Sequence, residues 1–326
     1  MRQLSFPVLL CGTLLLPNAL LADPLPSWND TETKARIIDF VETVTDPTSP
    51  HYVTPADRIA TFDNDGNLWA EQPVYFQLIF AIDRVAQLAE ADPSIATSDA
   101  MKAAAAKDYK AVIATGKEGL IEVLSASHSG DSETYIAAVS DWLETATHPK
   151  TGLLYRDMTY QPMVELLRYL RDEDFETFIV SGGGIHFIRA YADAAYGIPT
   201  QNVVGSQTVT TYDVIDGKPV IVKEPQIFFN DDKGGKPIGI DNHIGKRPIF
   251  ASGNSDGDYQ MLEYTTAGNG LRLGVLLHHT DGEREFAYDR EGHIGVLNKG
   301  LDEAEDKGWL VIDMENDWGR IFTGKQ

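Results

Sequence analysis

Apolar residues recur with two different periods along this chain, and the change from one period to the other divides it into segments. Residues 33–44 carry an apolar stripe at helical spacing, whereas residues 59–62 form a short apolar run typical of a buried strand. Residues 73–144 contain little Gly or Pro and keep a helical period throughout. Their apolar positions predict helices near 74–90, 98–114, 117–127 and 131–146. Because the pattern changes sharply afterwards, this block is predicted to be a helical insert.

From residue 161 onwards, segments of helical and strand character alternate. The apolar pattern predicts helices at 162–174, 185–197 and 259–268, a helix start at 236–245, and strands at 175–184, 247–258 and 271–279. Residues 209–223 are predicted to form a hairpin that turns at Asp216-Gly217. Strands that alternate with helices favour a parallel sheet covered by helices on both faces, so we expect an α/β fold. Ligands of such sheets gather at the carboxyl ends of the strands.

Two acids follow the first predicted strand, in the stretch IATFDNDGNLW. Asp63 and Asp65 stand one residue apart, and Gly66 comes next. An Asp-Gly pair between apolar residues is a common hairpin turn. The alternative is a pair of reactive carboxylates at a strand end, because residues two apart can point to the same side of a strand.

Polar residues also follow two later strands. In FIVSGGGIHF, Ser181 is followed by Gly182 and Gly183, and a predicted helix begins shortly afterwards. This arrangement suits a phosphate group, although glycine at such a junction is often only a tight turn. In IFASGNSDGD, oxygen ligands suited to Mg²⁺ appear as Asn254, Asp256 and Asp258. A solvated acidic loop is the alternative interpretation of this stretch.

The order of these features is more specific than any one of them. D-x-D-G after a strand, a helical insert, S-G-G, a Lys at a helix start and G-N-x-x-x-D follow one another along residues 56–285. In this the chain resembles the haloacid dehalogenase (HAD) superfamily of phosphohydrolases, and within it the phosphoserine-phosphatase-like branch. The resemblance implies a three-layer α/β/α Rossmann-like core with a parallel sheet, formed by residues 23–72 and 150–326. It implies a helical cap at residues 73–149, inserted after the first core strand.

The resemblance also implies catalytic roles. Asp63 would be the nucleophile that forms an aspartyl-phosphate, and Asp65 would be the acid and base that protonates the leaving group and activates water. The metal ligands for Mg²⁺ would be Asp63, the backbone carbonyl of Asp65, Asn254 and Asp258. Asp256 is an alternative to Asn254 as the direct ligand.

Phosphate binding and charge neutralisation are assigned by the same resemblance. The phosphoryl oxygens would be held by Ser181, Gly182 and Gly183. Lys236 would neutralise the phosphorylated aspartate, because it begins a helix-like segment upstream of the last motif. Lys233 and Lys246 are the alternatives for this role.

Two departures from the family pattern bear on activity. Asn67 stands where the family has threonine, and Asn254 stands where it has aspartate. The second change removes a negative charge from the metal site. We expect an Mg²⁺-dependent phosphomonoesterase acting on small phosphorylated metabolites, and the alternative is a weakened or inactive secreted binding protein on the same fold.

Residues near the motifs suggest further contacts. The aromatic residues Trp69, Tyr75 and Phe76 are candidates for core packing or for the wall of a substrate pocket, where Glu71 would contact a polar or cationic group. The pair His278-His279 is predicted to have a structural role, because adjacent strand residues face opposite ways and chelate a metal poorly.

The charge composition of the chain disfavours two classes of binding partner. The chain has 49 acidic residues against 27 lysines and arginines, which gives a formal net charge of -22. Such a charge disfavours binding to nucleic acid or to an anionic membrane. A phosphorylated substrate would therefore need a cation supplied locally by the site.

The N-terminal segment has the order of a secretory signal peptide. An arginine precedes an apolar stretch that ends near Ala22, and the only cysteine of the chain, Cys11, lies within it. Cleavage of residues 1–22 would give a periplasmic or secreted protein without thiols and without a membrane partner. The alternative is an uncleaved N-terminal anchor. No second apolar run approaches membrane-spanning length.

Overall fold

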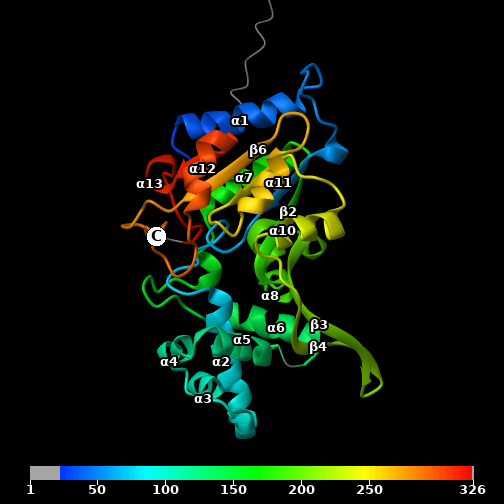
Figure 1. Ribbon diagram of the computed structural model, residues 1–326, viewed down its shortest axis with the longest axis vertical. Helices are drawn as coiled ribbons and strands as arrows, with labels where there is room; N and C mark the ends of the chain where they lie inside the picture. Colours follow the sequence, from blue (N-terminus) through cyan, green and yellow to red (C-terminus); the bar gives the residue numbers. More distant parts are fainter. Residues whose placement is uncertain (1–22, 129, 325–326) are drawn as a thin grey trace, which may run out of the picture.

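A single seven-stranded sheet forms the centre of the molecule in a computed structural model that describes residues 23–128 and 130–324 (Figure 1). The strand order is β4-β3-β2-β1-β5-β6-β7, and β3–β4 is the antiparallel pair among otherwise parallel neighbours. The strands are β1 Ile59–Phe62, β2 Glu176–Gly184, β3 Val203–Ile215, β4 Lys218–Phe229, β5 Phe250–Gly253, β6 Leu273–His278 and β7 Leu310–Asp313. The predicted α/β fold with a mainly parallel sheet is confirmed. The predicted signal peptide and Cys11 lie outside the described residues.

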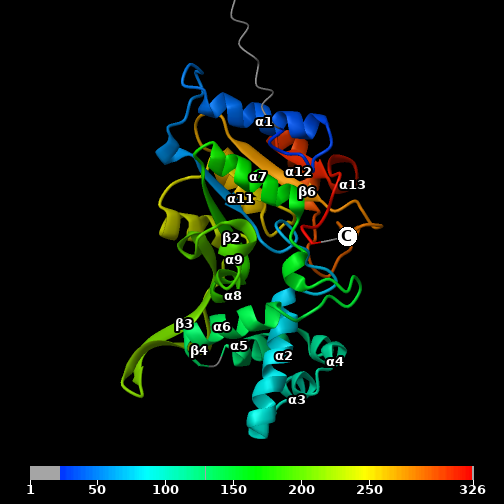
Figure 2. The ribbon, with the colours of Figure 1, turned by 180° about the vertical axis from the view of Figure 1, so that it is seen from behind.

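Helices cover both faces of this sheet (Figures 1 and 2). Helices α1 and α7 lie over one face, and α10, α11 and α12 lie over the other. The helices of the core are α1 Glu32–Thr45, α7 Gln161–Asp172, α8 Ile185–Arg189, α9 Ala192–Tyr196, α10 Gly235–Gly239, α11 Tyr259–Thr266, α12 Lys299–Lys307 and α13 Met314–Asp317. The three-layer arrangement predicted from the alternation of elements is therefore present.

Strand β1 lies between β2 and β5, and this order brings the motifs that follow the three strands together. All four residues of β1 are buried, and β1 pairs with β2 on one side and with β5 on the other. Phe62 lies opposite Ile179 of β2 and Ser252 of β5. Because the three strands are parallel neighbours, the loops that follow them leave the same edge of the sheet.

Aromatic packing fixes the sheet against α1. The ring of Phe250 on β5 lies 5.4 Å from that of Phe62 on β1 and 6.1 Å from that of Phe40 on α1. Burying one such side chain contributes about 1.5–3 kcal/mol to the free energy of unfolding. This packing holds the last residue of β1 rigidly, next to Asp63.

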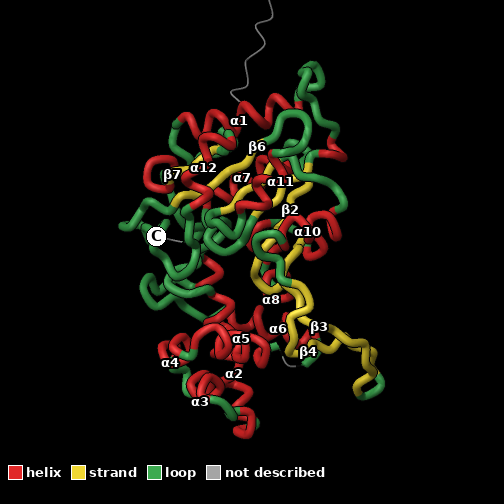
Figure 3. Tube along the Cα trace, in the orientation of Figure 1, coloured by secondary structure: helices red, strands yellow, loops and turns green. Residues whose placement is uncertain are grey.

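The part of the sequence between β1 and α7 folds into a helical lobe. It lies in the lower part of Figure 3 as a group of red helices. Its helices are α2 Phe76–Ala91, α3 Asp99–Ala105, α4 Tyr109–Ala114, α5 Gly116–Ser127 and α6 Ser132–Leu143. Leu78, Ile82, Val85 and Met101 belong to a separate apolar cluster of this lobe. Among residues 23–128 and 130–324, no helix is long and apolar enough to cross a membrane.

Some predicted elements differ in detail from the observed ones. The helix predicted at 98–114 is split into α3 and α4, and Lys107 between them has a positive φ of 55°. The helix predicted at 185–197 is likewise split into α8 and α9. The hairpin turns at Asp216-Gly217 as predicted, with both residues at positive φ, but its strands extend several residues further at each end. Strand β7 and helix α12 were not predicted.

Candidate active site

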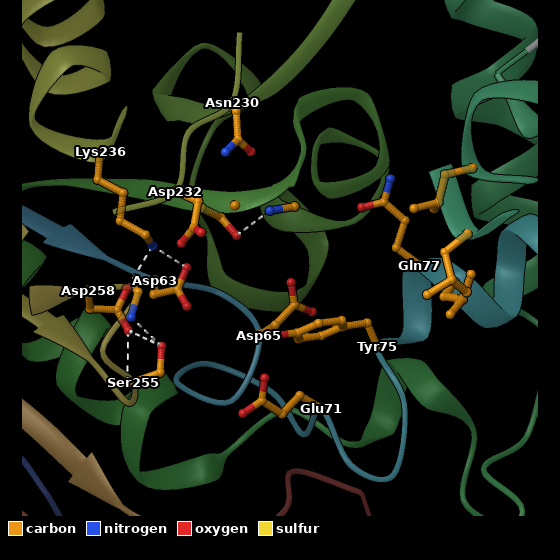
Figure 4. Close-up of a pocket in the computed structure, with 17 residues that line it drawn as sticks. Asp63, Asp65, Glu71, Tyr75, Gln77, Asn230, Asp232, Lys236, Ser255 and Asp258 are labelled. Atoms are coloured by element: carbon orange, nitrogen blue, oxygen red, sulfur yellow. Dashed lines mark hydrogen bonds and ion pairs between the residues drawn. The ribbon is translucent and has the colours of Figure 1, made fainter. Parts of the chain in front are cut away.

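A cavity of about 340 Å³ opens at the carboxyl ends of β1 and β2 and beside the loop that follows β5 (Figure 4). Residues of α2 and α5 in the helical lobe close its other side. The acidic and basic side chains of its wall are Asp63, Asp65, Glu71, Asp232, Asp258 and Lys236. The cavity also contacts Ser181, Gly182 and Gly183, so the three predicted motifs converge on one space.

Lys236 bridges two of the acids. Its Nζ lies 2.6 Å from Oδ1 of Asp63 and 2.7 Å from Oδ1 of Asp258, and it donates a third bond to the carbonyl of Val180 on β2. Lys236 is buried, and burial alone would lower the pKa of its ammonium group; the carboxylates of Asp258 and Asp63 outweigh this and raise the pKa. The lysine is therefore a fixed cation in contact with Asp63.

The two alternative lysines lie elsewhere. The side chain of Lys233 is exposed. Lys246 donates to the carbonyl of Ala56 and to Asp57 at the opposite end of β1. Of the three lysines considered from the sequence, Lys236 is the one that the fold brings to Asp63.

Asp65 lies across the cavity from the lysine (Figure 4). Its Oδ1 accepts a hydrogen bond of 2.8 Å from the indole of Trp69. Burial raises the pKa of Asp65, although the hydrogen bond from Trp69 opposes the change. Burial also raises the pKa of Asp63, reinforced by the nearby Asp258 and opposed by Lys236. The two carboxyl groups thus differ in partner, since one is bound to a cation and the other to a neutral donor.

The Ser-Gly-Gly segment is part of β2 and not of a turn, because β2 continues to Gly184 before α8 begins. A register shift between Ser181 and Gly184 disturbs its pairing with β3. The backbone N–H of Gly183 donates to Oγ of Ser181 at 3.1 Å, and that of Gly184 donates to Gln77 of α2 at 2.8 Å. Ser181 and the two glycines after it face the cavity.

The carboxamide of Asn254 has an oxygen suited to a metal ion. Its Nδ2 donates to Oε1 of Glu71 at 2.8 Å, which fixes the orientation of the amide. Its Oδ1 is buried and has no hydrogen-bond partner among the described residues. A buried polar oxygen without a partner is costly, and coordination of a hard cation would relieve that cost. Together with Asp63 and the carbonyl of Asp65, it fits the oxygen ligands that Mg²⁺ prefers.

Asp258, a predicted metal ligand, and Asp256, the alternative to Asn254, already accept hydrogen bonds within the protein. Oδ2 of Asp258 accepts from the backbone N–H groups of Asn254 and Ser255, while its Oδ1 pairs with Lys236. The carboxylate of Asp256 accepts three backbone N–H bonds at the start of α12 and does not line the cavity. In the part of the chain that the structure describes, no group of three or more His, Cys, Asp or Glu residues could hold a metal, so Mg²⁺ would depend on Asn254 and a backbone carbonyl.

Asn67 ties the loop after β1 to β5. Its Nδ2 donates to the carbonyl of Asp63 at 3.0 Å, and its Oδ1 accepts from Oγ of Ser252 at 2.8 Å. A threonine hydroxyl is too short to span these two partners in the same way. The amide of Asn67 thus holds the backbone of Asp63 in place through hydrogen bonds that a threonine at this position would not form in the same way.

Three residues that the motifs do not include support the same loop. His279 contacts the carbonyl of Gly66 through Nε2 at 2.7 Å, and its ring stacks on Tyr288 at 4.3 Å. The hydroxyl of Tyr288 donates to Oε1 of Glu71 at 2.7 Å. Burial raises the pKa of Glu71 well above its ordinary value. Tyr288 was missed because it lies in an irregular segment, whereas the structural role predicted for the His278-His279 pair agrees with the contact of His279.

Of the three aromatic residues after the first motif, Trp69 and Phe76 pack in the core, whereas Tyr75 lines the cavity. Trp69 is buried and stacks on Tyr191 at 4.4 Å, and Phe76 packs against Tyr155 at 4.4 Å. Both belong to the core. Tyr75 is partly exposed and lines the cavity, as Figure 4 shows.

Comparison with protein families identifies the chain. The model of the haloacid dehalogenase-like hydrolases matches residues 60–263, which is more than half of the chain. The chain belongs to the haloacid dehalogenase-like hydrolases, and the family predicted from the order of its motifs is confirmed. The match includes β1, β2, β5, Lys236 and the helical lobe, but it ends before His279.

Solved structures are similar to this chain at low sequence identity. A functionally unknown protein from Anaerococcus prevotii is 15% identical, with 79% of this chain and 88% of that chain covered and a TM-score of 0.52. A protein of unknown function from Bordetella pertussis is 18% identical, with 79% and 98% covered and a TM-score of 0.46. A phosphoserine phosphohydrolase-like protein from Francisella tularensis is 19% identical, with 76% and 98% covered and a TM-score of 0.39. A search of the curated proteins found no match.

Proposed function

We propose that this protein is an Mg²⁺-dependent phosphomonoesterase that acts on small phosphorylated metabolites through an aspartyl-phosphate. The observation that carries the proposal is the buried contact of Lys236 with Asp63, with Asp65 in the same cavity. A carboxylate held against a fixed cation suits attack on phosphorus, because phosphoryl transfer depends mainly on positioning and charge neutralisation. Membership of a family of hydrolases supports the same reaction class.

In the first step, a carboxylate oxygen of Asp63 forms a bond to phosphorus while the bond from phosphorus to the leaving oxygen breaks. Asp65, which contacts the neutral indole of Trp69 and not the cation of Lys236, donates its proton to that leaving oxygen. In the second step, Asp65 removes a proton from water, whose oxygen bonds to phosphorus as the bond to Asp63 breaks. Inorganic phosphate and the free carboxylate of Asp63 result.

Other groups hold and neutralise the phosphate. Lys236 lies where it would offset the charge on the phosphorylated aspartate, and Ser181 and the following glycines face the same space. When bound by Asp63, Asn254 and the carbonyl of Asp65, Mg²⁺ supplies positive charge that stabilises the transferring phosphoryl group.

The substrate is a small molecule in this proposal. A cavity of about 340 Å³ closed by α2 and α5 suits a metabolite better than a phosphoprotein or a nucleic acid. A net charge of -22 argues in the same direction. We also propose a periplasmic or secreted location, which rests on the apolar N-terminal segment alone.

Hydrolysis of p-nitrophenyl phosphate with and without Mg²⁺ tests this function. We expect turnover by the wild type that EDTA abolishes, and a loss of about a thousandfold or more in kcat for Asp63→Asn. Asp99→Asn removes an acid from an exposed position of α3 and serves as the control, which should retain activity. Unchanged turnover in Asp63→Asn would refute the proposed nucleophile.

The alternative is a binding protein that has lost catalysis, and the two asparagines Asn67 and Asn254 favour it. If the wild type binds inorganic phosphate in a calorimetric titration but hydrolyses no phosphomonoester at any Mg²⁺ concentration, this alternative replaces the enzyme. Hydrolysis that depends on Asp63 would exclude it.

A further inference from the structure

A second cavity of about 220 Å³ lies beside the first one. The two share four wall residues, which are Gln77, Leu124, Gly182 and Asn230. Gly182 belongs to the predicted phosphate-binding segment, so the second cavity adjoins the place where the phosphoryl group would bind. Its remaining wall comes from the end of α5 and from the hairpin β3–β4.

A buried lysine stands in this wall. Lys223 of β4 is only 5% exposed, and its Nζ donates to Nδ1 of His186 at 2.8 Å. The same ammonium lies 4.7 Å from the centre of the Tyr135 ring. Among residues 23–128 and 130–324, no carboxylate lies within 4.0 Å of it, so no ion pair balances its charge. An ammonium group has three N–H donors, and the contacts of Lys223 with described residues, which are a histidine nitrogen and a ring face, occupy fewer than three.

The surroundings of Lys223 add no negative charge. Burial, together with the positive charge of Arg189, lowers the pKa of Lys223 to about 8. Burial also lowers the pKa of His128 to about 3 and that of His186 to about 4, so both rings are neutral at pH 7. In a chain with a net charge of -22, this is a local site of positive potential beside the reaction centre. A buried charge without a counter-ion is costly, and a bound anion removes that cost.

A second donor in the same cavity has no partner. Oγ1 of Thr208 on β3 is shielded from solvent and forms no hydrogen bond within the described part of the chain. Ser125 and Gln207 line the cavity as well. A carboxylate or phosphate group has oxygens that can accept hydrogen bonds from the Lys223 ammonium.

We infer that the second cavity binds an additional anionic group of the substrate, which is a phosphomonoester that also carries a carboxylate or a second phosphate. The inference rests on the proposed phosphatase function, because it places the scissile phosphate at Asp63 and Lys236. The other anionic group lies at Lys223, and Gly182 and Gln77 line both positions. The structural alternative is that Lys223 only packs against Tyr135.

Steady-state kinetics with matched substrates separates these two roles. The substrates are 3-phosphoglycerate against glycerol 3-phosphate, and fructose 1,6-bisphosphate against fructose 6-phosphate, with p-nitrophenyl phosphate as the reference that has one anionic group. We expect the wild type to prefer at least one substrate with two anionic groups by tenfold or more in kcat/KM. Preference in the first pair identifies a carboxylate as the second group, and preference in the other pair identifies a phosphate.

The variant Lys223→Met keeps the length of the side chain and removes its charge. We expect it to lower kcat/KM for the preferred substrate by about 10- to 100-fold, mainly through KM, and to change p-nitrophenyl phosphate hydrolysis by less than about threefold. Lys223→Arg should restore part of the preference. Lys218→Met, which removes an exposed lysine from the start of the same strand, is the control and should keep the wild-type preference.

Two results would overturn the inference. One is equal loss on all substrates in Lys223→Met, which a purely structural lysine predicts, and the other is a wild type without preference in either pair. If Lys223→Met does not fold, inhibition of the wild type decides: 3-phosphonopropionate should inhibit p-nitrophenyl phosphate hydrolysis at least tenfold more strongly than propylphosphonate, and equal inhibition refutes the site. Absence of any hydrolysis by the wild type would refute the proposed function itself, which is a different outcome.

Discussion

At the scale of single residues, the neutral Asn254 changes the charge of the site without changing its outline. An amide at this position can donate to Glu71 and still keep one oxygen for a cation, whereas a carboxylate could not donate. Glu71 therefore lies one hydrogen bond away from the position where the family has its acid, and burial raises the pKa of its carboxyl group. Its hydroxyl partner Tyr288 holds it there.

This arrangement predicts the behaviour of Asn254→Asp. In EDTA, the substitution removes the amide donor that Asn254 presents to Oε1 of Glu71, and the free energy of unfolding should fall by about 1–3 kcal/mol. With Mg²⁺ the added charge becomes favourable, so the increase of the melting temperature on addition of Mg²⁺ should exceed that of the wild type. Thermal denaturation with and without Mg²⁺ measures both effects.

A matched variant controls for net charge. Asn269→Asp adds the same charge at an exposed position and should respond to Mg²⁺ like the wild type. If the two variants show the same response to Mg²⁺, Asn254 does not contact the ion.

At the scale of elements, the turn after β1 depends on a glycine for two separate reasons. Gly66 has a φ of 76°, which other residues adopt at a cost of about 1 kcal/mol. A Cβ atom on Gly66 would in addition collide with the side chains of Asn254 and Glu71. Gly217 in the β3–β4 turn has a similar φ of 78°, and no atom lies within 4 Å of the position that a Cβ would occupy there, so it isolates the backbone effect.

We therefore expect Gly66→Ala to lower the free energy of unfolding by more than about 2 kcal/mol, against about 1 kcal/mol for Gly217→Ala. Phosphatase activity should fall by at least tenfold in Gly66→Ala and remain near the wild-type value in Gly217→Ala. Urea denaturation and p-nitrophenyl phosphate assays of the two variants test this difference. Equal losses of stability in both would show that crowding at Gly66 is unimportant.

Some of these elements and site residues could be predicted from the sequence, and others could not. The strand ends at Asp63 and Ser181 were predictable, because parallel strands must deliver their following loops to one edge of the sheet. Lys236 was preferred over Lys233 and Lys246 from its place at a helix-like segment, and the fold adds its contact with Asp63 and its burial. The roles of Tyr288 and Lys223 could not be predicted, because the first lies in an aperiodic loop and the second in a strand whose long-range partners leave no local pattern.

At the scale of the whole molecule, the net charge opposes the proposed substrates. A chain with a charge of -22 repels anions at a distance, whereas Lys236 and Lys223 place buried cationic groups in the walls of the two cavities. Salt screens the distant charges more than the buried ones.

This contrast predicts an unusual salt dependence. Between about 10 and 150 mM NaCl, kcat/KM for an anionic phosphomonoester should rise by a few-fold, because the Debye length falls from about 30 Å to about 8 Å. Assays at constant free Mg²⁺ measure this change. A fall in kcat/KM over the same range would indicate that local cations, and not the overall charge, dominate substrate capture.

The order in which the chain is synthesised has a consequence for when the site becomes complete. The turn that carries Asp65 and Gly66 is formed near the N-terminal end, yet it is held by His279 and, through Glu71, by Tyr288. These supports lie beyond the segment matched by the family model and follow the last motif. A nascent chain can therefore contain β1, β2 and β5 before it contains the residues that fix the turn, and the proposed hydrolysis would require synthesis to continue through Tyr288.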